Sequence, residues 1–297
     1  MKCDLCPRKC LVDRKKGEKG ICGQTENLKV ARAALHFWEE PCISGDAGSG
    51  AVFFSGCPLH CVFCQNENIA NGTVGKEISL ERLVDIFLEL QEKRANNINL
   101  VTPGHFVPQI VKALDQARKE GLTLPVVYNT SSYETVDTIK MLEGYVDIYL
   151  PDFKYMSPVL SKKYSHAPDY AEVAKAAIAE MVRQTGKAVF VNGEEDNLIL
   201  SGTIVRHLTL PGCMADSMQI LKYLHDTYGD MIYISIMNQF TPLSNLEKYP
   251  ELNRRITDEE YETLVDYAIE IGIENGFIQD GETAEESFIP EFDNEGV

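Results

Sequence analysis

The chain has 297 residues, 44% hydrophobic and 25% charged, a composition typical of a soluble globular protein with one large domain or two ordinary ones. Its net charge of -17 disfavours broad attraction to nucleic acid or anionic membranes. No apolar stretch reaches the length of a membrane span, and no secretory segment follows Met1. We therefore expect a cytoplasmic protein with no nucleic-acid and no membrane partner, whose nine cysteines are metal ligands rather than disulfides.

The first expected element is a cysteine-rich segment over residues 1–45. Its four closely spaced cysteines follow the pattern C-x2-C-x3-C-x11-C and are Cys3, Cys6, Cys10 and Cys22. Basic residues between Arg8 and Lys19 would offset the negative charge of a thiolate-rich site. Four thiolates suit zinc or an auxiliary 4Fe–4S cluster, with free thiols as the alternative. Spacing does not choose the metal, although a closed structural site such as zinc is slightly favoured because the chain can fill all four positions.

A second cysteine group follows the apolar run 51–54, which predicts a short buried strand. Its members, Cys57, Cys61 and Cys64, have the spacing C-x3-C-x2-C, and the aromatic Phe63 precedes the last of them. Three thiolates are soft ligands suited to zinc or iron–sulfur chemistry. A 4Fe–4S cluster is usually held by four cysteines, so three would leave one iron without a protein ligand. The alternative for this pattern is a zinc knuckle.

Strands and helices then alternate over the region 46–280. Further strands are expected over 97–101, 124–128, 146–150, 204–210 and 231–237, and helices over 79–94, 107–119, 134–142, 170–185, 217–228 and 257–271. An exposed turn is expected over 192–196, and the acidic tail 281–297 should either be disordered or lie over the mouth of a barrel. Six such units favour parallel strands with right-handed crossovers, and composition alone would also allow a doubly wound sheet.

Polar residues lie within or just after these expected strands. The candidates are His105, Asn129, Asp152, Lys154, Arg206 and Asn238. Asp152 and Lys154 are two residues apart on a strand, so their side chains project to the same face. Arg206 lies in an apolar strand and needs a partner for its guanidinium. The alternatives are a structural Asp152–Lys154 ion pair, a barrel carboxylate beside Arg206, a structural His105 and an ordinary turn at Asn238.

The motif C-x3-C-x-aromatic-C resembles the signature of the radical S-adenosylmethionine (SAM) superfamily. Over nearly its whole length, including the N-terminal Cys-x2-Cys-Pro-Arg-x-Cys, the chain resembles the PflX-type side branch of the pyruvate formate-lyase activating enzymes. The resemblance implies an α/β fold, a partial (β/α)6 TIM-like barrel with a small cysteine-rich N-terminal extension. It implies that Cys57, Cys61 and Cys64 are the catalytic cysteines that hold a 4Fe–4S cluster. The free iron would chelate SAM, which an electron cleaves to methionine and a 5′-deoxyadenosyl radical.

The same resemblance implies roles for the strand-end residues. Asp152-Phe153-Lys154 is similar to an Asp-Leu-Lys motif that helps bind SAM and a nearby monovalent cation. Arg206 matches an Arg whose partner would be the SAM carboxylate, and Asn129 stands where the branch has an acid. Asn238 would hydrogen-bond the adenine or ribose of SAM. His105 is the clearest departure, because the branch places Gly-Gly-Glu there to meet the SAM amino group.

These features predict an oxidoreductase of the pyruvate formate-lyase activating type. Its partner would be a glycyl radical enzyme, and its reductant a protein such as flavodoxin or ferredoxin. The departure at His105 favours an alternative, the radical modification of a peptide or small metabolite. A third alternative is a non-catalytic metal-binding scaffold.

Overall fold

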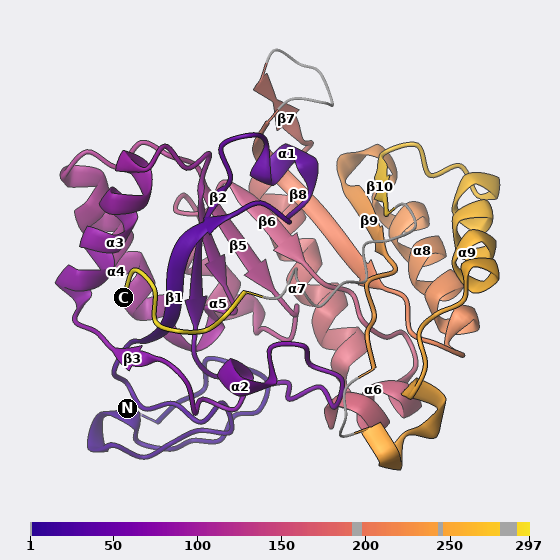
Figure 1. The fold of residues 1–297 in the computed structure, drawn as a ribbon, viewed down its shortest axis with the longest axis horizontal. Helices are drawn as coiled ribbons and strands as arrows, with labels where there is room; N and C mark the ends of the chain where they lie inside the picture. The colour runs from indigo at the N-terminus through magenta and orange to yellow at the C-terminus, as the bar shows by residue number, and fades with distance from the viewer. Residues whose placement is uncertain (1, 192–197, 243–245, 280–289) are drawn as a thin grey trace.

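The computed structural model describes residues 2–191, 198–242, 246–279 and 290–297, whose strands form one open sheet (Figure 1). The strand order is β10-β9-β8-β6-β5-β4-β2-β1-β3, with β7 paired to β8. The six strands expected from the sequence are β2 (Ser49–Phe54), β4 (Ile98–Val101), β5 (Val126–Thr130), β6 (Ile148–Pro151), β8 (Ile199–Leu208) and β9 (Tyr233–Met237). They are parallel neighbours in chain order. Because a doubly wound sheet would reverse its strand order, this confirms the partial TIM-like barrel.

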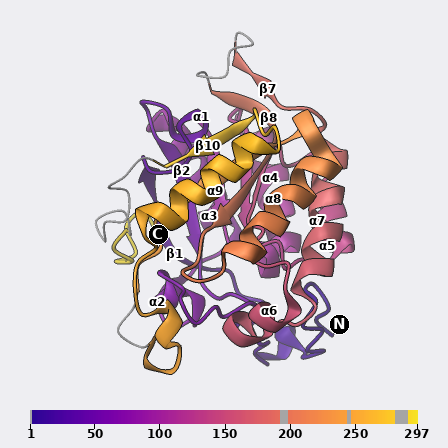
Figure 2. The ribbon, with the colours of Figure 1, turned by 90° about the vertical axis from the view of Figure 1, so that its right-hand side faces the viewer.

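Helices cover the outer side of this sheet, as Figures 1 and 2 show. They are α3 (Leu80–Glu92), α4 (Val107–Lys119), α5 (Val136–Lys140), α7 (Tyr170–Thr185), α8 (Met214–Tyr228) and α9 (Asp258–Glu270). Helices α4 and α7 have the bounds expected from the sequence. Helix α9 begins with the capping box of Thr257 and Glu260, which satisfies two backbone N–H groups. Helix α5 is shorter than expected because Thr135 is its N-cap.

Several short elements were not expected from the sequence. They are β1 (Lys29–His36), α1 (Pro41–Ser44), α2 (Glu67–Ala70), β3 (Lys76–Glu77), α6 (Pro158–Ser165), β7 (Val189–Phe190) and β10 (Gly276–Ile278). The longest strand among them is β1, which pairs antiparallel with β2 and so joins the predicted N-terminal segment 1–45 to the barrel sheet. Its three alanines have weak strand propensity, which hid it in the sequence. The division at residue 45 therefore stays a prediction.

The end of the chain lies beside β1. The Ala33 amide donates to the Glu295 carbonyl (2.8 Å) and the Asn294 amide to the Ala31 carbonyl (3.1 Å), so the yellow terminal segment in Figure 1 follows the dark strand. The expected turn over 192–196 and residues 281–289 of the tail lie outside the described residues. None of the described helices is long and apolar enough to cross a membrane.

The loop that carries the second cysteine group is anchored in an apolar core. Leu59 and Phe63 are buried, and both belong to a cluster that also contains side chains of α7, α8 and α9. The Phe63 ring meets those of Tyr155 and Phe240 edge-on, with centroids 6.5 and 6.0 Å apart. Burial of two large side chains holds the loop at the end of β2.

Candidate functional site

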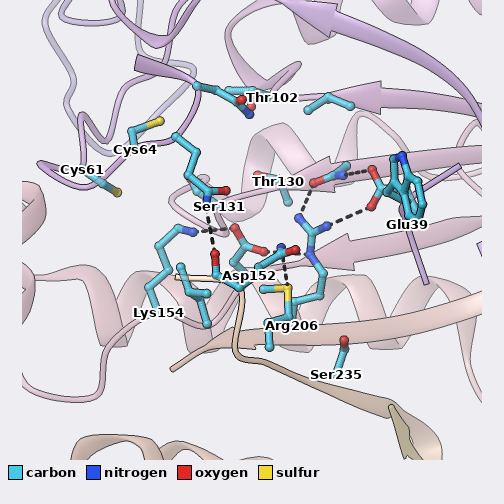
Figure 3. A pocket seen from close by; sticks show the side chains of 18 of the residues that line it. Glu39, Cys61, Cys64, Thr102, Thr130, Ser131, Asp152, Lys154, Arg206 and Ser235 are labelled. Carbon is cyan, nitrogen blue, oxygen red and sulfur yellow. Dashed lines mark hydrogen bonds and ion pairs between the residues drawn. The ribbon is translucent and has the colours of Figure 1, made fainter. Parts of the chain in front are cut away.

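A cavity of about 340 Å³ lies where the parallel strands end. Cys57, Cys61 and Cys64 line it, and so do polar side chains from the ends of other strands, namely Thr102, Asn129, Thr130, Asp152, Lys154, Arg206 and Ser235. In Figure 3 the labelled cysteines lie on one side of the cavity, and Arg206 and Glu39 lie away from them. The structure thus gathers the second cysteine group and four of the predicted strand-end residues around one space.

The three cysteines of this loop are partly buried. Burial and the charge of Cys61 raise the pKa of Cys57 to about 11, and burial also raises the pKa of Cys64. Burial raises the pKa of Cys61 as well. The Lys154 charge and the hydrogen bond that the Ser165 hydroxyl donates to the Cys61 sulfur (3.0 Å) offset part of this rise. Such thiols need a bound cation to become thiolates.

The chemistry of this donor set fits an iron–sulfur cluster. Three soft sulfur donors border a cavity that leaves room for a further ligand beside them. In the part of the chain that the structure describes, no three His, Cys, Asp or Glu side chains are grouped as the ligands of a single metal ion would be.

Arg206 is the centre of a buried charge network beside the cavity. Its Nε donates to Asp152 Oδ1 (2.9 Å) and its Nη1 to Glu39 Oε2 (3.1 Å), as Figure 3 shows. Its Nη2 donates to Asn129 Oδ1 (2.6 Å). Burial alone would lower the pKa of Arg206, but the charges of Asp152 and Glu39 raise it above its ordinary value. The pairing with barrel carboxylates, one of the two alternatives for Arg206, is therefore present, and contact with a SAM carboxylate stays a prediction.

Asp152 lies between two cations. Lys154 Nζ donates to its Oδ2 (2.6 Å) while Arg206 occupies its other oxygen. Burial would raise the pKa of Asp152, but Arg206 and Lys154 outweigh it and hold the pKa below its ordinary value. Burial would likewise lower the pKa of Lys154, but Asp152 and Cys61 raise it. Both groups therefore stay charged at neutral pH.

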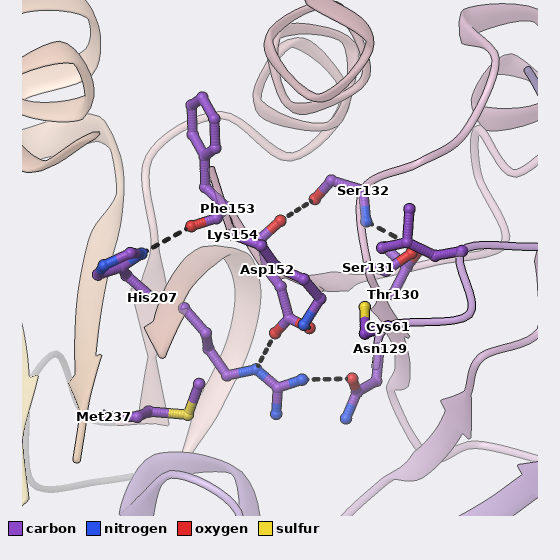
Figure 4. A network of polar contacts seen from close by, with 12 residues as sticks. Cys61, Asn129, Thr130, Ser131, Ser132, Asp152, Phe153, Lys154, His207 and Met237 are labelled. Atoms are coloured by element: carbon purple, nitrogen blue, oxygen red, sulfur yellow. Dashed lines mark hydrogen bonds and ion pairs between the residues drawn. The ribbon is translucent and has the colours of Figure 1, made fainter. Parts of the chain in front are cut away.

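Hydrogen bonds to the backbone fix the strand end that carries these charges. The Ser132 hydroxyl donates to the Asp152 carbonyl (2.6 Å), and His207 Nδ1 donates to the Phe153 carbonyl (2.8 Å), as Figure 4 shows. Because Nδ1 carries the proton, His207 Nε2 can accept from the Ser217 hydroxyl (2.8 Å). Burial lowers the pKa of His207 to about 4, so the imidazole is neutral.

Glu39 and Glu40 are site residues that the sequence did not reveal. Glu39 Oε1 accepts from the side-chain amides of Asn129 and Asn99, both at 3.1 Å, while its other oxygen meets Arg206. Glu40 is buried beside it, and burial raises its pKa despite the Arg206 charge. Two adjacent acids before Pro41 are visible in the sequence, but nothing in the sequence indicated that they would contact residues of other strands.

Two predicted cofactor-binding residues lie outside the cavity lining. His105 is buried in the short 3-10 helix Gly104–Phe106, and its Nε2 is 2.7 Å from the Ser55 carbonyl, directly before the cysteine loop. Asn238 faces Gln279 through its amide and side chain (2.9 and 3.3 Å). In contrast, Phe63 lines the cavity beside the cysteines. The positions of His105 and Asn238 therefore do not support a contact with the cofactor, and both contacts stay predictions.

Solved structures with a similar fold include SuiB of Streptococcus suis bound to S-adenosylmethionine, with a TM-score of 0.52 and 12% identity over 76% of this chain and 49% of that chain. HydG, a maturase of the FeFe hydrogenase, gives a TM-score of 0.51 and 15% identity over 78% of this chain and 52% of that chain. The chain thus spans about half the length of both proteins. At these identities the likeness shows the fold.

Two sequence comparisons extend over more of the chain. It is 28% identical over 275 residues to an uncharacterized protein of Methanocaldococcus jannaschii, which covers 90% of this chain and 74% of the relative. Residues 51–199, which include the cysteine loop and the strand end of Asp152 and Lys154, match the model of the radical SAM superfamily. The chain therefore belongs to the radical SAM superfamily.

Proposed function

We propose that this protein is an enzyme that reductively cleaves SAM at a 4Fe–4S cluster. The observation that carries the proposal is that the thiols of Cys57, Cys61 and Cys64 border the same cavity as a buried network of fixed charges. A cluster bound by three cysteines supplies a free iron for SAM and the electron that splits SAM into methionine and a 5′-deoxyadenosyl radical. The resemblance in the cysteine motif and the family match support this assignment.

The residues around the cavity would position the cofactor and exclude water. Lys154 lies close enough to Cys61 for its charge to lower the pKa of that thiol, so its ammonium would offset the negative charge of the thiolates. Phe63 closes the cavity beside the cysteines with an apolar ring. The Asp152–Arg206–Glu39 network is already hydrogen-bonded, so it would meet SAM without reorganising.

The substrate that we propose is a protein or peptide, with a glycyl radical enzyme as the first candidate. The Asp152-Phe153-Lys154 motif and Arg206 support this subtype through their resemblance to the activating enzymes. Radical modification of a peptide or small metabolite is the second candidate, because Thr102 and His105 replace the motif of that branch. One protein of similar fold, SuiB, is described as bound to a precursor peptide. A flavodoxin or ferredoxin would supply the electron.

Anaerobic reconstitution of the full chain tests the proposed reaction. We expect iron and sulfide to be retained, and SAM plus dithionite to give 5′-deoxyadenosine. Cys61→Ala should abolish the product, while Cys213→Ala should retain it, because Cys213 is a buried thiol outside the cavity lining. A reconstituted protein that leaves SAM intact under reduction would overturn the proposal.

A second measurement separates the two substrate classes. Mixing the active enzyme with candidate glycyl radical enzymes should give a glycyl doublet in electron paramagnetic resonance. Transfer of deuterium from a labelled peptide or metabolite into 5′-deoxyadenosine, without a doublet, would favour the second class and reject the first.

A further inference from the structure

The N-terminal residues 2–24, here called the N-terminal brace, lie against the cysteine loop of the radical site. Arg8 forms the first contact: its Nε donates to the Pro58 carbonyl (2.8 Å) and its Nη2 to the Leu59 carbonyl (3.4 Å). The same guanidinium donates to the carbonyls of Ser165 (3.0 Å) and His166 (2.6 Å) at the end of α6. One side chain of the brace therefore joins the loop to the barrel.

The other end of the brace touches the same loop at two further points. His60 Nε2 is 2.8 Å from the Ile21 carbonyl. Gly56, with φ of 92°, stands so close to the Cys22 carbonyl that a side chain there would clash with it. Arg14 Nη1 donates to the His105 carbonyl (2.5 Å), and His105 Nε2 in turn contacts Ser55. The loop is thus held from Ser55 to His60.

The brace has almost no apolar core of its own. Its only buried residues are Cys6, Arg14, Cys22 and Gln24, whereas the side chains of Leu11 and Ile21 are about half exposed. Hydrophobic burial therefore cannot hold this segment in one conformation. Small segments that lack a core are usually held by a metal or by disulfides, and all nine cysteines of the chain are free.

Two of the four cysteines of the brace, Cys10 and Cys22, lie beside Gly20. A side-chain carbon at Gly20 would stand 3.1 Å from the Cys10 sulfur and 3.5 Å from the Cys22 sulfur, so only glycine leaves this space open. Arg14 Nη1 is 4.0 Å from the Cys3 sulfur and would offset thiolate charge.

We propose that Cys3, Cys6, Cys10 and Cys22 bind a structural metal centre and that this centre holds the brace against the cysteine loop. Four thiolates fill every position of such a site, which leaves no open position for a substrate and makes the role structural. Among the described residues these four thiols are not grouped as the ligands of a single ion would be, which favours a 4Fe–4S cluster over zinc, and the metal analysis below separates the two. The brace fixes the loop whether or not the loop carries a cluster, so the proposal stands apart from SAM cleavage.

Metal analysis of the full chain tests the site. Zinc and iron are measured by mass spectrometry in the wild type and in Cys6→Ser, Cys22→Ser, Cys61→Ala and the control Cys42→Ser, whose thiol is buried in α1. We expect the brace variants to lose zinc, or the iron of one cluster, which Cys61→Ala and Cys42→Ser keep. If a brace variant does not fold, titration of wild-type thiols with a mercurial reagent should release the same metal. Brace variants with the same metal content as the wild type, or no release from the wild type, would overturn the proposal.

Hydrogen exchange of the loop amides 55–64 tests the brace independently of activity. Arg8→Ala removes four backbone contacts, and Arg118→Ala is a matched control because Arg118 donates to the carbonyls of Gly144 and Tyr145 and covers an aromatic ring. We expect Arg8→Ala and the metal-depleted protein to exchange these amides at least ~10-fold faster than the wild type, and Arg118→Ala to match the wild type. Unchanged protection in the metal-depleted protein would overturn the positioning role.

Discussion

Arg206 on β8 and Glu39 before α1 are 167 residues apart in the chain, yet they form a buried ion pair of 3.1 Å beside the cavity. Asp152 and Lys154 complete the network, so that two cations face two carboxylates. A buried charge network of this kind costs desolvation energy and is stable only while its charges balance. The balance makes each member sensitive to the loss of another.

Glu39→Gln should therefore destabilise the protein strongly. It leaves Asp152 as the one carboxylate hydrogen-bonded to Arg206 and Lys154 in a buried site, which costs about 3 kcal/mol. The measurement is urea unfolding of the full chain, with Glu89→Gln as the control, because Glu89 forms a partly exposed pair with Arg82 that should contribute less than about 1 kcal/mol. Equal losses in the two variants would contradict a buried, balanced network.

The strand-end part of this network could be predicted from the sequence. Alternating strands and helices placed Asn129 and Asp152 after parallel strands and Arg206 within one, and parallel strands end at the same edge of a sheet. Lys154 followed because residues two apart on a strand share a face. Their convergence needed only the order of the strands, which the alternation of elements indicated.

The Glu39 contact could not be predicted, because it depends on β1. This strand has an alanine-rich sequence without a strong pattern, and its pairing with β2 brings the following residues back over the cavity. The positions of His105 and Asn238 outside the cavity lining were hidden for a related reason. A residue can follow the end of a strand and still contact the neighbouring loop, as His105 does at Ser55 and Asn238 does at Gln279.

Lys154→Met should weaken SAM binding while the cluster is retained. Methionine keeps much of the length of the side chain, so the change removes mainly the charge beside Cys61 and Asp152. We expect at least a ~10-fold loss in SAM affinity, which is about 1.4 kcal/mol, with the iron content unchanged. The measurements are calorimetric titration of the reconstituted protein and iron analysis. Lys175→Met, on α7, is the control, and unchanged affinity in Lys154→Met would contradict this role.

The neutral His207 predicts a specific pH dependence of stability. Its pKa falls from 6.5 to about 4 on folding because the ring is buried, so the unfolded chain binds more protons between these values. Its contribution is therefore full above pH 6.5 and is lost as the pH falls towards 4, by about 2 kcal/mol at pH 5.

His207→Gln removes this titration but keeps a side-chain donor and acceptor for Phe153 and Ser217. Denaturant unfolding at pH 7 and pH 5 should show a smaller loss of stability on acidification in this variant than in the wild type. His225→Gln, on α8, should lose as much stability between pH 7 and pH 5 as the wild type does. The same pH dependence in all three proteins would contradict a buried neutral imidazole at position 207.

Gly296 tests whether the terminal segment protects the edge of β1. Its φ is 72°, and a side chain there would run into the Ala33 carbonyl, beside the backbone bond from Ala33 to Glu295. Gly296→Ala should displace residues 290–297, expose an unpaired strand edge and promote association.

Gly144→Ala is the matched control, because Gly144 has a similar φ of 78° but no atom near the added carbon, so it should cost only about 1 kcal/mol. Limited proteolysis and light scattering should show early cleavage at the C-terminus and larger particles for Gly296→Ala alone. Equal behaviour of the two variants would show that backbone strain, and not the contact with β1, determines the effect.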